Sequence, residues 1–220
     1  MTYKEQTREL VSEDAFKNLC IYVEMIEEKN KVMNLTGFKG DRLWEEGIYE
    51  SIFLLKEFFG EPIGKEILDI GAGAGFPSVP FLIAYPQNKL TIYEPTKKRT
   101  IFLNEVRNRI GLIMDIKNIR SEDSNQEEIF DYITARAVMH FKPLCEVSHK
   151  PAKIGAKFAF LKGPKAKDEL HEARFIKKTL DIEPEIIEIS TRTRSNFIIT
   201  YLKNGKTKEK YPRKWIDIIK

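Results

Sequence analysis

The stretch Asp69-Ile70-Gly71-Ala72-Gly73-Ala74-Gly75-Phe76-Pro77 follows an apolar run at 66–68 and precedes a second apolar run at 79–84. The first run suits a strand and the second suits a helix. Glycines are needed where the backbone turns tightly and a ligand must come close to it. The sequence therefore predicts a strand, a glycine-rich turn and a helix that together form a ligand site. The alternative is a purely structural turn in another α/β domain.

The side chains around this turn indicate the kind of ligand. Phe76 stands where the dinucleotide pattern G-x-G-x-x-G would place its third glycine. Asp69 puts a carboxylate at the end of the strand, where it would repel a pyrophosphate. Glu94 closes the next strand-like run, and an acid at that position commonly binds both ribose hydroxyls of an adenosine. Together these features favour S-adenosylmethionine, whose sulfonium and ammonium groups are positive.

The composition is that of an ordinary globular protein. The chain has 220 residues, enough for one full core and a small appendage. No apolar run is long enough to span a membrane, and the first residues have no signal-peptide pattern. Cys20 and Cys145 have no metal-type spacing, which favours buried thiols in a reducing compartment. We therefore expect a cytoplasmic protein without a membrane segment.

Positive charge is concentrated near the end of the chain. The formal net charge is +4, and residues 203–220 hold seven basic and two acidic side chains, so this segment alone carries +5. A basic segment on a nearly neutral body is typical of a protein that binds a polyanion such as RNA. An ordinary solvated terminus can have the same composition.

Alternating strand and helix patterns predict the fold class. Helical periodicities at 12–35 and 43–59 predict an N-terminal helical cap over residues 1–64. Strands and helices then alternate over residues 65–203, which specifies a mostly parallel sheet with helices on both faces. We expect one Rossmann-like α/β domain over residues 1–220, with seven strands, an antiparallel last pair, and a basic tail at 204–220. The expected strands lie at 66–70, 89–94, 114–118, 132–135, 157–161, 185–190 and 197–202, and the later helices at 76–85, 96–110, 126–129, 142–150 and 165–179.

Short motifs spread over nearly the whole chain resemble one protein family. They are Asn30 to Thr36, Tyr49-Glu50-Ser51-Ile52, Asp69 to Pro80, Lys98 to Leu103, Arg120-Ser121-Glu122, Phe130 to Val138, and Lys210-Tyr211-Pro212-Arg213-Lys214. In order and spacing they resemble the glucose-inhibited division protein B family, the bacterial methyltransferases of guanine N7 in 16S ribosomal RNA. The chain departs from the family pattern at Gly47, often histidine, at Glu50, usually aspartate, and in its apolar ending at 215–219.

The resemblance implies a function, a cofactor and partners. It implies a class I methyltransferase that uses S-adenosylmethionine to methylate N7 of a guanine in the 530 loop region, as a monomer acting on 16S ribosomal RNA or the small ribosomal subunit. Guanine N7 carries a lone pair and no proton, so we expect alignment of the reactants, without a catalytic base or a metal. Two rivals stay open: a methyltransferase of the same fold for a small molecule or protein, and a catalytically silent RNA-binding protein.

Eight residues are expected to form the cofactor site. Four have structural alternatives: Glu94 as an acid at a helix start, Ser121 and Glu122 as a helix cap, and Phe76 as a core side chain. Arg136 lies among apolar neighbours just past the fourth strand, where it would bind the methionine carboxylate, a substrate phosphate, or an acid such as Glu122. The full set is Asp69, Gly71, Gly73, Phe76, Glu94, Ser121, Glu122 and Arg136.

Six basic residues are expected to contact RNA phosphates. Two follow the fifth strand, whose carboxyl end faces the ligand crevice in this kind of sheet. Two lie in the link between the last strands and two lie in the basic tail, and all six would position the RNA without reading bases. They are Lys162, Lys165, Arg192, Arg194, Lys210 and Arg213.

Overall fold

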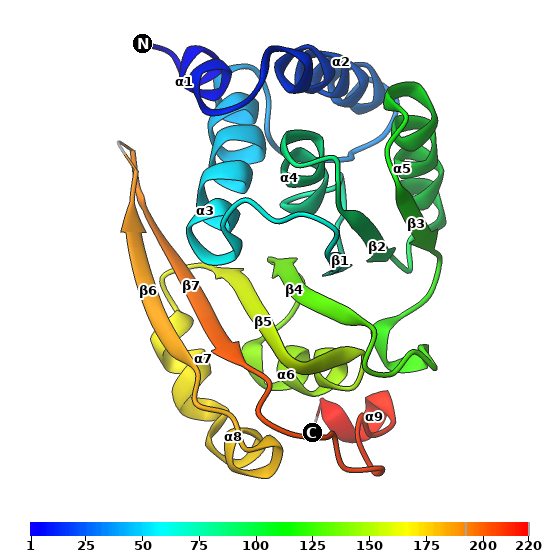
Figure 1. Ribbon diagram of the computed structural model, residues 1–220, viewed down its shortest axis with the longest axis vertical. Coiled ribbons are helices and arrows are strands. Elements are labelled where there is room, and N and C mark those ends of the chain that lie inside the picture. Colours follow the sequence, from blue (N-terminus) through cyan, green and yellow to red (C-terminus); the bar gives the residue numbers. More distant parts are fainter. Residues whose placement is uncertain (192, 220) are drawn as a thin grey trace.

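A seven-stranded sheet forms the centre of the computed structural model, which describes residues 1–191 and 193–219 (Figure 1). The strands are β1 (Glu66–Ile70), β2 (Lys89–Tyr93), β3 (Met114–Lys117), β4 (Phe130–Arg136), β5 (Ala152–Lys162), β6 (Glu185–Ser190) and β7 (Ser195–Leu202). Their order in the sheet is β3-β2-β1-β4-β5-β7-β6. β7 runs antiparallel to both of its neighbours, and the pairs from β3 to β5 are parallel. The Rossmann-like prediction is therefore confirmed.

Helices cover both faces of the sheet, as Figure 1 shows. Side chains alternate between the faces along each strand, so that Ile67 and Leu68 belong to different hydrophobic clusters. One cluster joins the sheet to α2, α3, α4 and α5, and the other joins it to α6 and α8. The helices are α1 (Tyr3–Leu10), α2 (Glu13–Asn30), α3 (Glu50–Phe59), α4 (Ser78–Ala84), α5 (Lys97–Ile110), α6 (Phe141–His149), α7 (Ala166–Glu172), α8 (Arg174–Leu180) and α9 (Trp215–Ile218), with the π-helix η1 (Leu43–Tyr49) and the 3-10 helix η2 (Ser121–Asp123).

The topology places the ligand crevice. β1 pairs with β2 on one side and with β4 on the other, so the chain changes direction across the sheet between β1 and β4. Open α/β sheets bind ligands at the carboxyl ends of the strands beside such a switch point. The glycine-rich turn leaves β1 at this point, and the segment 137–140 leaves β4 beside it.

Several predicted helices have other bounds in the structure. Ser12 caps α2 as expected, because its Oγ accepts the N–H of Ala15 at 3.2 Å. The helix ends at Asn30, earlier than predicted, because the Asn30 Oδ1 accepts the backbone N–H groups of Leu35 and Thr36 and turns the chain. The helix predicted at 43–59 begins as a π-helix, and the one predicted at 165–179 divides into α7 and α8. The segment 126–129 is not helical.

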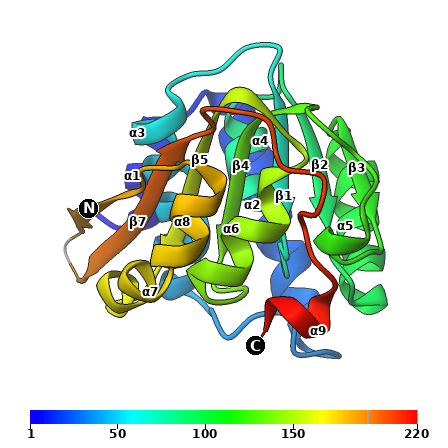
Figure 2. The same ribbon diagram turned by 90° about the horizontal axis from the view of Figure 1, so that it is seen from below.

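The C-terminal segment is docked on the body of the protein through its apolar residues and Arg213, while Lys206, Lys208, Lys210 and Lys214 are exposed. In Figure 2 this segment crosses α6 before it reaches α9. Tyr211 and Ile218 are buried, and the side chain of Arg213 is bonded to Glu146 on α6. The guanidinium of Arg120 lies over the ring of Trp215, 5.4 Å from its centre. The apolar residues at 215–219 suggest docking on the core, whereas the partner of Arg213 could not be found from the sequence because Glu146 is 67 residues away.

A search for membrane spans found none: across the described chain, no helix is both long and apolar enough to cross a bilayer.

Acid is expected to destabilise the protein through His149, which is fully buried at the end of α6. Burial and nearby Lys203 lower the pKa of His149 from 6.5 to about 3. Between these two pH values, His149 is protonated in the unfolded chain and neutral in the folded protein. The free energy of unfolding is therefore highest above pH 6.5 and decreases as the pH falls. We expect a loss of about 1–2 kcal/mol between pH 6.5 and 5 in urea unfolding. The variant His149→Phe should lose this dependence, and an unchanged pH profile in that variant would contradict the assignment.

Candidate functional site

The glycine-rich turn has backbone angles that its glycines make possible. Gly71, Gly73 and Gly75 have φ angles of 72°, 60° and 111°, in or near the left-handed region. A Cβ on Gly71 would lie 2.4 Å from Cγ2 of Val138. Nothing lies within 4 Å of the corresponding position on Gly73. Gly71 is therefore required by packing against the segment after β4, and Gly73 offers an open backbone face to a ligand.

Asp69 points into the protein. The residue is fully buried, and Oδ2 accepts a hydrogen bond from the Oγ of Ser78 at the start of α4. Oδ1 has no hydrogen-bond partner among the described residues, and burial raises the pKa of the carboxyl to about 8. This geometry gives Asp69 a clear role in holding the turn against α4. Its direct contact with a cationic ligand stays a prediction.

Glu94 links the two strand ends beneath the turn. Its Oε2 accepts the N–H of Gly73 at 3.0 Å, and its Oε1 accepts the N–H of Thr96 at 2.8 Å, just before α5. The side chain is 1% exposed, with Arg99 3.8 Å away. The structural role of an acid at a helix start is thus confirmed, and each oxygen keeps a lone pair for a ribose hydroxyl.

The turn after β3 holds a second acid. Ser121 Oγ donates to the carbonyl of Val147 at 2.9 Å, which anchors η2 on α6. Oε1 of Glu122 is buried without a hydrogen-bond partner among the described residues, and Arg120 lies 3.8 Å from it. A buried carboxylate oxygen without a hydrogen bond is uncommon in proteins. A ligand N–H at this end of the sheet would satisfy it, so these residues fit the adenine end of S-adenosylmethionine.

Phe76 is a core side chain beside the turn, which is the structural role that the sequence left open. Its ring lies 6.1 Å from that of Tyr22 and 5.9 Å from that of Phe38. A Cβ on Gly47 would lie 2.9 Å from Cζ of Phe76, so this phenylalanine fills the space that a larger side chain at 47 would need. Its contact with the cofactor stays a prediction.

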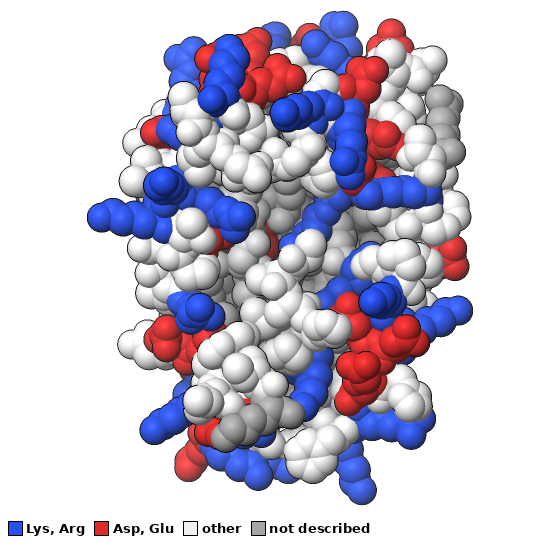
Figure 3. All heavy atoms as spheres, turned by 180° about the vertical axis from the view of Figure 1, so that it is seen from behind, with Lys and Arg blue, Asp and Glu red and all other residues white. Residues whose placement is uncertain are grey.

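A cavity of about 610 Å³ opens beside the carboxyl ends of β4 and β5. Figure 3 shows the back of the molecule relative to Figure 1, and that face is hollowed along its middle, with Lys and Arg side chains around the hollow. The cavity therefore has the size and the charged surroundings of a substrate site. It is lined by Phe38, Glu46, residues 136–140, residues 161–164, Glu169 and residues 194–196.

Arg136 lies in the wall of this cavity, and its partners differ from the acid suggested by sequence. It donates to the backbone carbonyl of Glu46, and its Nη2 lies 3.8 Å from the Glu46 carboxylate and 3.7 Å from that of Glu50. The pairing with Glu122 was wrong, because the N-terminal helices bring two other acids to the end of β4. Burial lowers the pKa of Arg136 to about 10, and its guanidinium lies over the ring of Phe38.

The predicted RNA contacts lie in different surroundings. Lys162 is nearly buried and paired with Glu169 at 2.8 Å, while Lys165 is exposed at the start of α7. Lys210 is exposed, with its ammonium 5.3 Å from the ring of Tyr211. Arg194 is bonded to Glu46 and Glu50, and Arg213 to Glu146, so both already have carboxylate partners. Arg192 lies outside the described residues. All of these phosphate contacts stay predictions.

Sequence reasoning gave no role to four residues that the structure brings to the cavity or to the ion pairs behind its wall. Glu50 could have been found, since it stands in the Tyr49-Glu50-Ser51 motif that carries the family resemblance. Glu46 lies one helical turn before it, at a spacing that places both acids on one face. Phe38 lies in an irregular loop and Asn196 lies at the start of β7, where no local pattern marks them.

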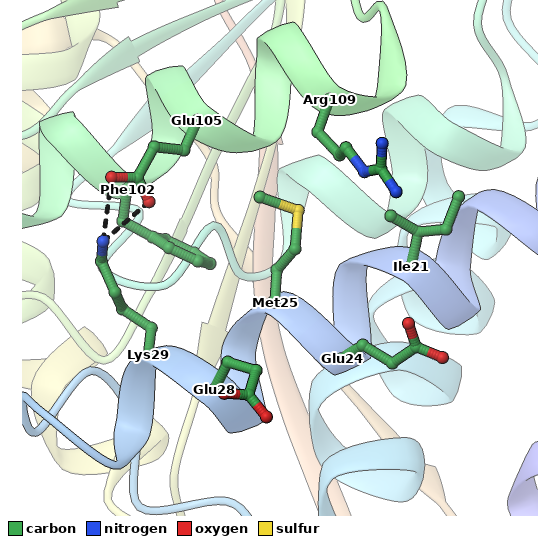
Figure 4. A pocket seen from close by; sticks show the side chains of 8 residues that line it. All are labelled: Ile21, Glu24, Met25, Glu28, Lys29, Phe102, Glu105 and Arg109. Atoms are coloured by element: carbon green, nitrogen blue, oxygen red, sulfur yellow. Dashed lines mark hydrogen bonds and ion pairs between the residues drawn. The ribbon is translucent and has the colours of Figure 1, made fainter.

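A second hollow, of about 400 Å³, lies between α2 and α5 (Figure 4). Lys29 of α2 bonds to Glu105 of α5 across it at 2.7 Å, and Met25 points toward Phe102 between the helices. It is lined by helix side chains and lies away from the strand ends, so we assign it no part in the site.

A family model matches most of the chain. Residues 15–198 match GidB, described as rRNA small subunit methyltransferase G. The chain belongs to this family. Ribosomal RNA small subunit methyltransferase G of Mycoplasmopsis pulmonis is 44% identical over 204 residues, covering 90% of this chain and 89% of that protein. The protein of the same name from Mesomycoplasma hyopneumoniae is 42% identical, covering 78% of this chain and 87% of that protein.

A solved structure shows the same fold. A SAM-dependent methyltransferase from Aquifex aeolicus superposes with a TM-score of 0.58 at 22% identity, covering 75% of this chain and 94% of that chain. At this identity the likeness concerns the fold alone. It confirms the class I methyltransferase architecture, and the family match confirms the resemblance drawn from the motifs.

Proposed function

We propose that this protein methylates N7 of a guanine in the 530 loop region of 16S ribosomal RNA, with S-adenosylmethionine as methyl donor. The observation that carries the proposal is the family match over residues 15–198. The site supports it, because the glycine turn, Glu94 and Glu122 follow neighbouring strands at their carboxyl ends, beside a cavity with basic surroundings.

The residues present fit the cofactor. The open backbone face at Gly73 would meet the amino-acid end, Glu94 would bind the ribose hydroxyls, and Glu122 would meet the adenine edge. When bound, S-adenosylmethionine supplies a methyl group activated by its positive sulfur.

The chain's own residues would do their work by alignment. Guanine N7 is a nucleophile without a proton to remove, so no general base is needed, and holding N7 in line with the methyl carbon removes much of the entropic barrier. The cavity beside Arg136 is placed to receive the guanine. Its arginines would hold the RNA backbone and fix the orientation of the base.

We further propose that the protein acts as a monomer in the cytoplasm. Both cysteines of the chain are free thiols, and burial raises the pKa of Cys145 to about 12, which keeps that thiol unreactive. Unoxidised cysteines fit a reducing compartment, where ribosomal RNA is made.

The proposal is tested by mapping 16S ribosomal RNA from cells with and without the gene by mass spectrometry of nuclease fragments. We expect one fragment of the 530 loop region to lose a 7-methylguanosine in cells without the gene. The purified protein should restore it when S-adenosylmethionine is supplied. An unchanged RNA together with cofactor binding would favour another substrate, and failure to bind the cofactor would favour a silent RNA-binding protein.

A further inference from the structure

Glu50 is a buried acid behind the cavity wall, where it is bonded to Arg194 and Asn196 of the lining. It begins α3 directly after the π-helix η1, and it is 0% exposed. Its Oε1 accepts from Nε of Arg194 and from Nδ2 of Asn196, both at 3.0 Å, and its Oε2 accepts from Nη2 of Arg194. A buried carboxylate must be paired and hydrogen-bonded to be tolerated. Glu50 therefore fixes Asn196, at the start of β7, and Arg194, just before that strand, against the N-terminal helices.

The guanidinium of Arg194 is bonded to Glu50 along one edge, and the rest of its side chain is accessible from the cavity. Nε and Nη2 face Glu50, while Nη1 faces Glu46 at the cavity. The side chain of Arg194 remains 34% exposed although Glu50 has no exposure. The planar fork of an arginine is oriented by such a two-point bond, which a lysine could not form.

Glu46 is the acid that the three arginines of this cluster share. Arg42, Arg136 and Arg194 all pair with its carboxylate, and Arg136 and Arg194 also pair with Glu50. Glu45 is a third acid near Arg42, so the cluster is close to neutral. The remaining charged pair of the lining, Lys162 with Glu169, is neutral as a pair. A backbone phosphate at the cavity would compete with the carboxylate of Glu46 for these three guanidinium groups.

We propose that Glu50 is a positioning residue, which holds Arg194 at the cavity wall in the orientation that binds the backbone of the substrate RNA. This rests on the proposed function, since it names how the RNA is held at the same site. The role belongs to Glu50 rather than Glu46 because only Glu50 is wholly enclosed and grips two nitrogens of one guanidinium.

The test compares Glu50→Gln with Glu57→Gln, which makes the same charge change at an exposed position of the same helix. The substrate is 16S ribosomal RNA from cells that lack the gene. We expect Glu50→Gln to raise KM for RNA about tenfold and to flatten the salt dependence of RNA binding by about 0.7 for each lost phosphate contact. Cofactor affinity and the values for Glu57→Gln should match those of the wild type. A folded Glu50→Gln variant with a wild-type KM and salt slope would overturn the proposal.

Variants of Arg194 keep the proposal testable if Glu50→Gln does not fold. Arg194→Lys retains the charge and loses the two-point bond, so we expect it to lose RNA affinity nearly as Arg194→Gln does. Wild-type behaviour of Arg194→Lys would mean that charge alone matters and would overturn the role of Glu50. In the folded double variant Glu50→Gln/Arg194→Gln, the losses should not add. If the wild type itself transfers no methyl group to RNA, the proposed function fails, which differs from any of these results.

Discussion

Replacing Glu94 by alanine is expected to weaken binding of S-adenosylmethionine by about 2–3 kcal/mol, or roughly 30- to 150-fold. The variant loses the acceptor for the ribose hydroxyls. It also frees the N–H groups of Gly73 and Thr96, which the carboxylate holds at 3.0 and 2.8 Å, so the ligand face of the turn is no longer fixed. Isothermal titration of the purified variant with the cofactor measures this loss, and thermal unfolding reports whether the turn still folds.

Two controls separate the ribose contact from a general effect. Glu94→Gln keeps one acceptor oxygen and should lose less affinity than the alanine variant. Asp115→Ala removes an exposed acid from the neighbouring strand β3 and should leave cofactor affinity unchanged. The side chain of Asp115 is 63% exposed, and its Oδ2 lies 3.5 Å from Nζ of Lys117. RNA affinity should barely change in all three. A folded Glu94→Ala variant with wild-type cofactor affinity would place the ribose elsewhere.

The core of the fold and the cofactor end of the site could be predicted because their signals are local. A strand, a glycine-rich turn and a helix lie together within 66–84, and left-handed backbone angles at Gly71 and Gly73 are what such a turn requires. Glu94 could be placed because the parallel pairing of β1 with β2 brings the two strand ends together. Periodicity was equally sufficient for the closing hairpin, whose strands lie within two residues of the predicted bounds.

Arg136, Lys162 and Arg194 were chosen from the sequence and do line one cavity. The carboxylate partners of its two arginines could not be predicted, because they come from distant segments. The partners of Arg136 come from η1 and α3, about 90 residues earlier in the chain, and those of Arg194 are still farther away. No spacing rule connects such positions. The tail shows the same limit, because the charge of a basic residue suggests a solvated or RNA-facing side chain, whereas Arg213 meets a buried acid on α6.

The ion pair between Arg213 and Glu146 is expected to hold the C-terminal segment in place, so Arg213→Ala should destabilise the protein by about 3 kcal/mol. Glu146 is fully buried, and its carboxylate accepts Nε and Nη2 of Arg213 at 3.0 and 2.7 Å. Without the guanidinium, the buried carboxylate keeps the backbone N–H of residue 213, at 2.8 Å, as its hydrogen-bond donor from this segment. The value lies at the low end for a broken buried pair because Arg213 is 33% exposed, so water can replace it in part.

Thermal unfolding of the variant should show a midpoint lower by roughly 6–12 °C. Lys214→Ala is the matched control, since it removes a neighbouring exposed cation and should leave the midpoint close to that of the wild type. Adding Glu146→Gln to Arg213→Ala removes the stranded charge and should recover part of the loss. The salt dependence of RNA binding decides between the two roles of Arg213. If its guanidinium serves Glu146, the slope stays as in the wild type, whereas a slope flatter by about 0.7 in the folded variant would return Arg213 to the RNA surface.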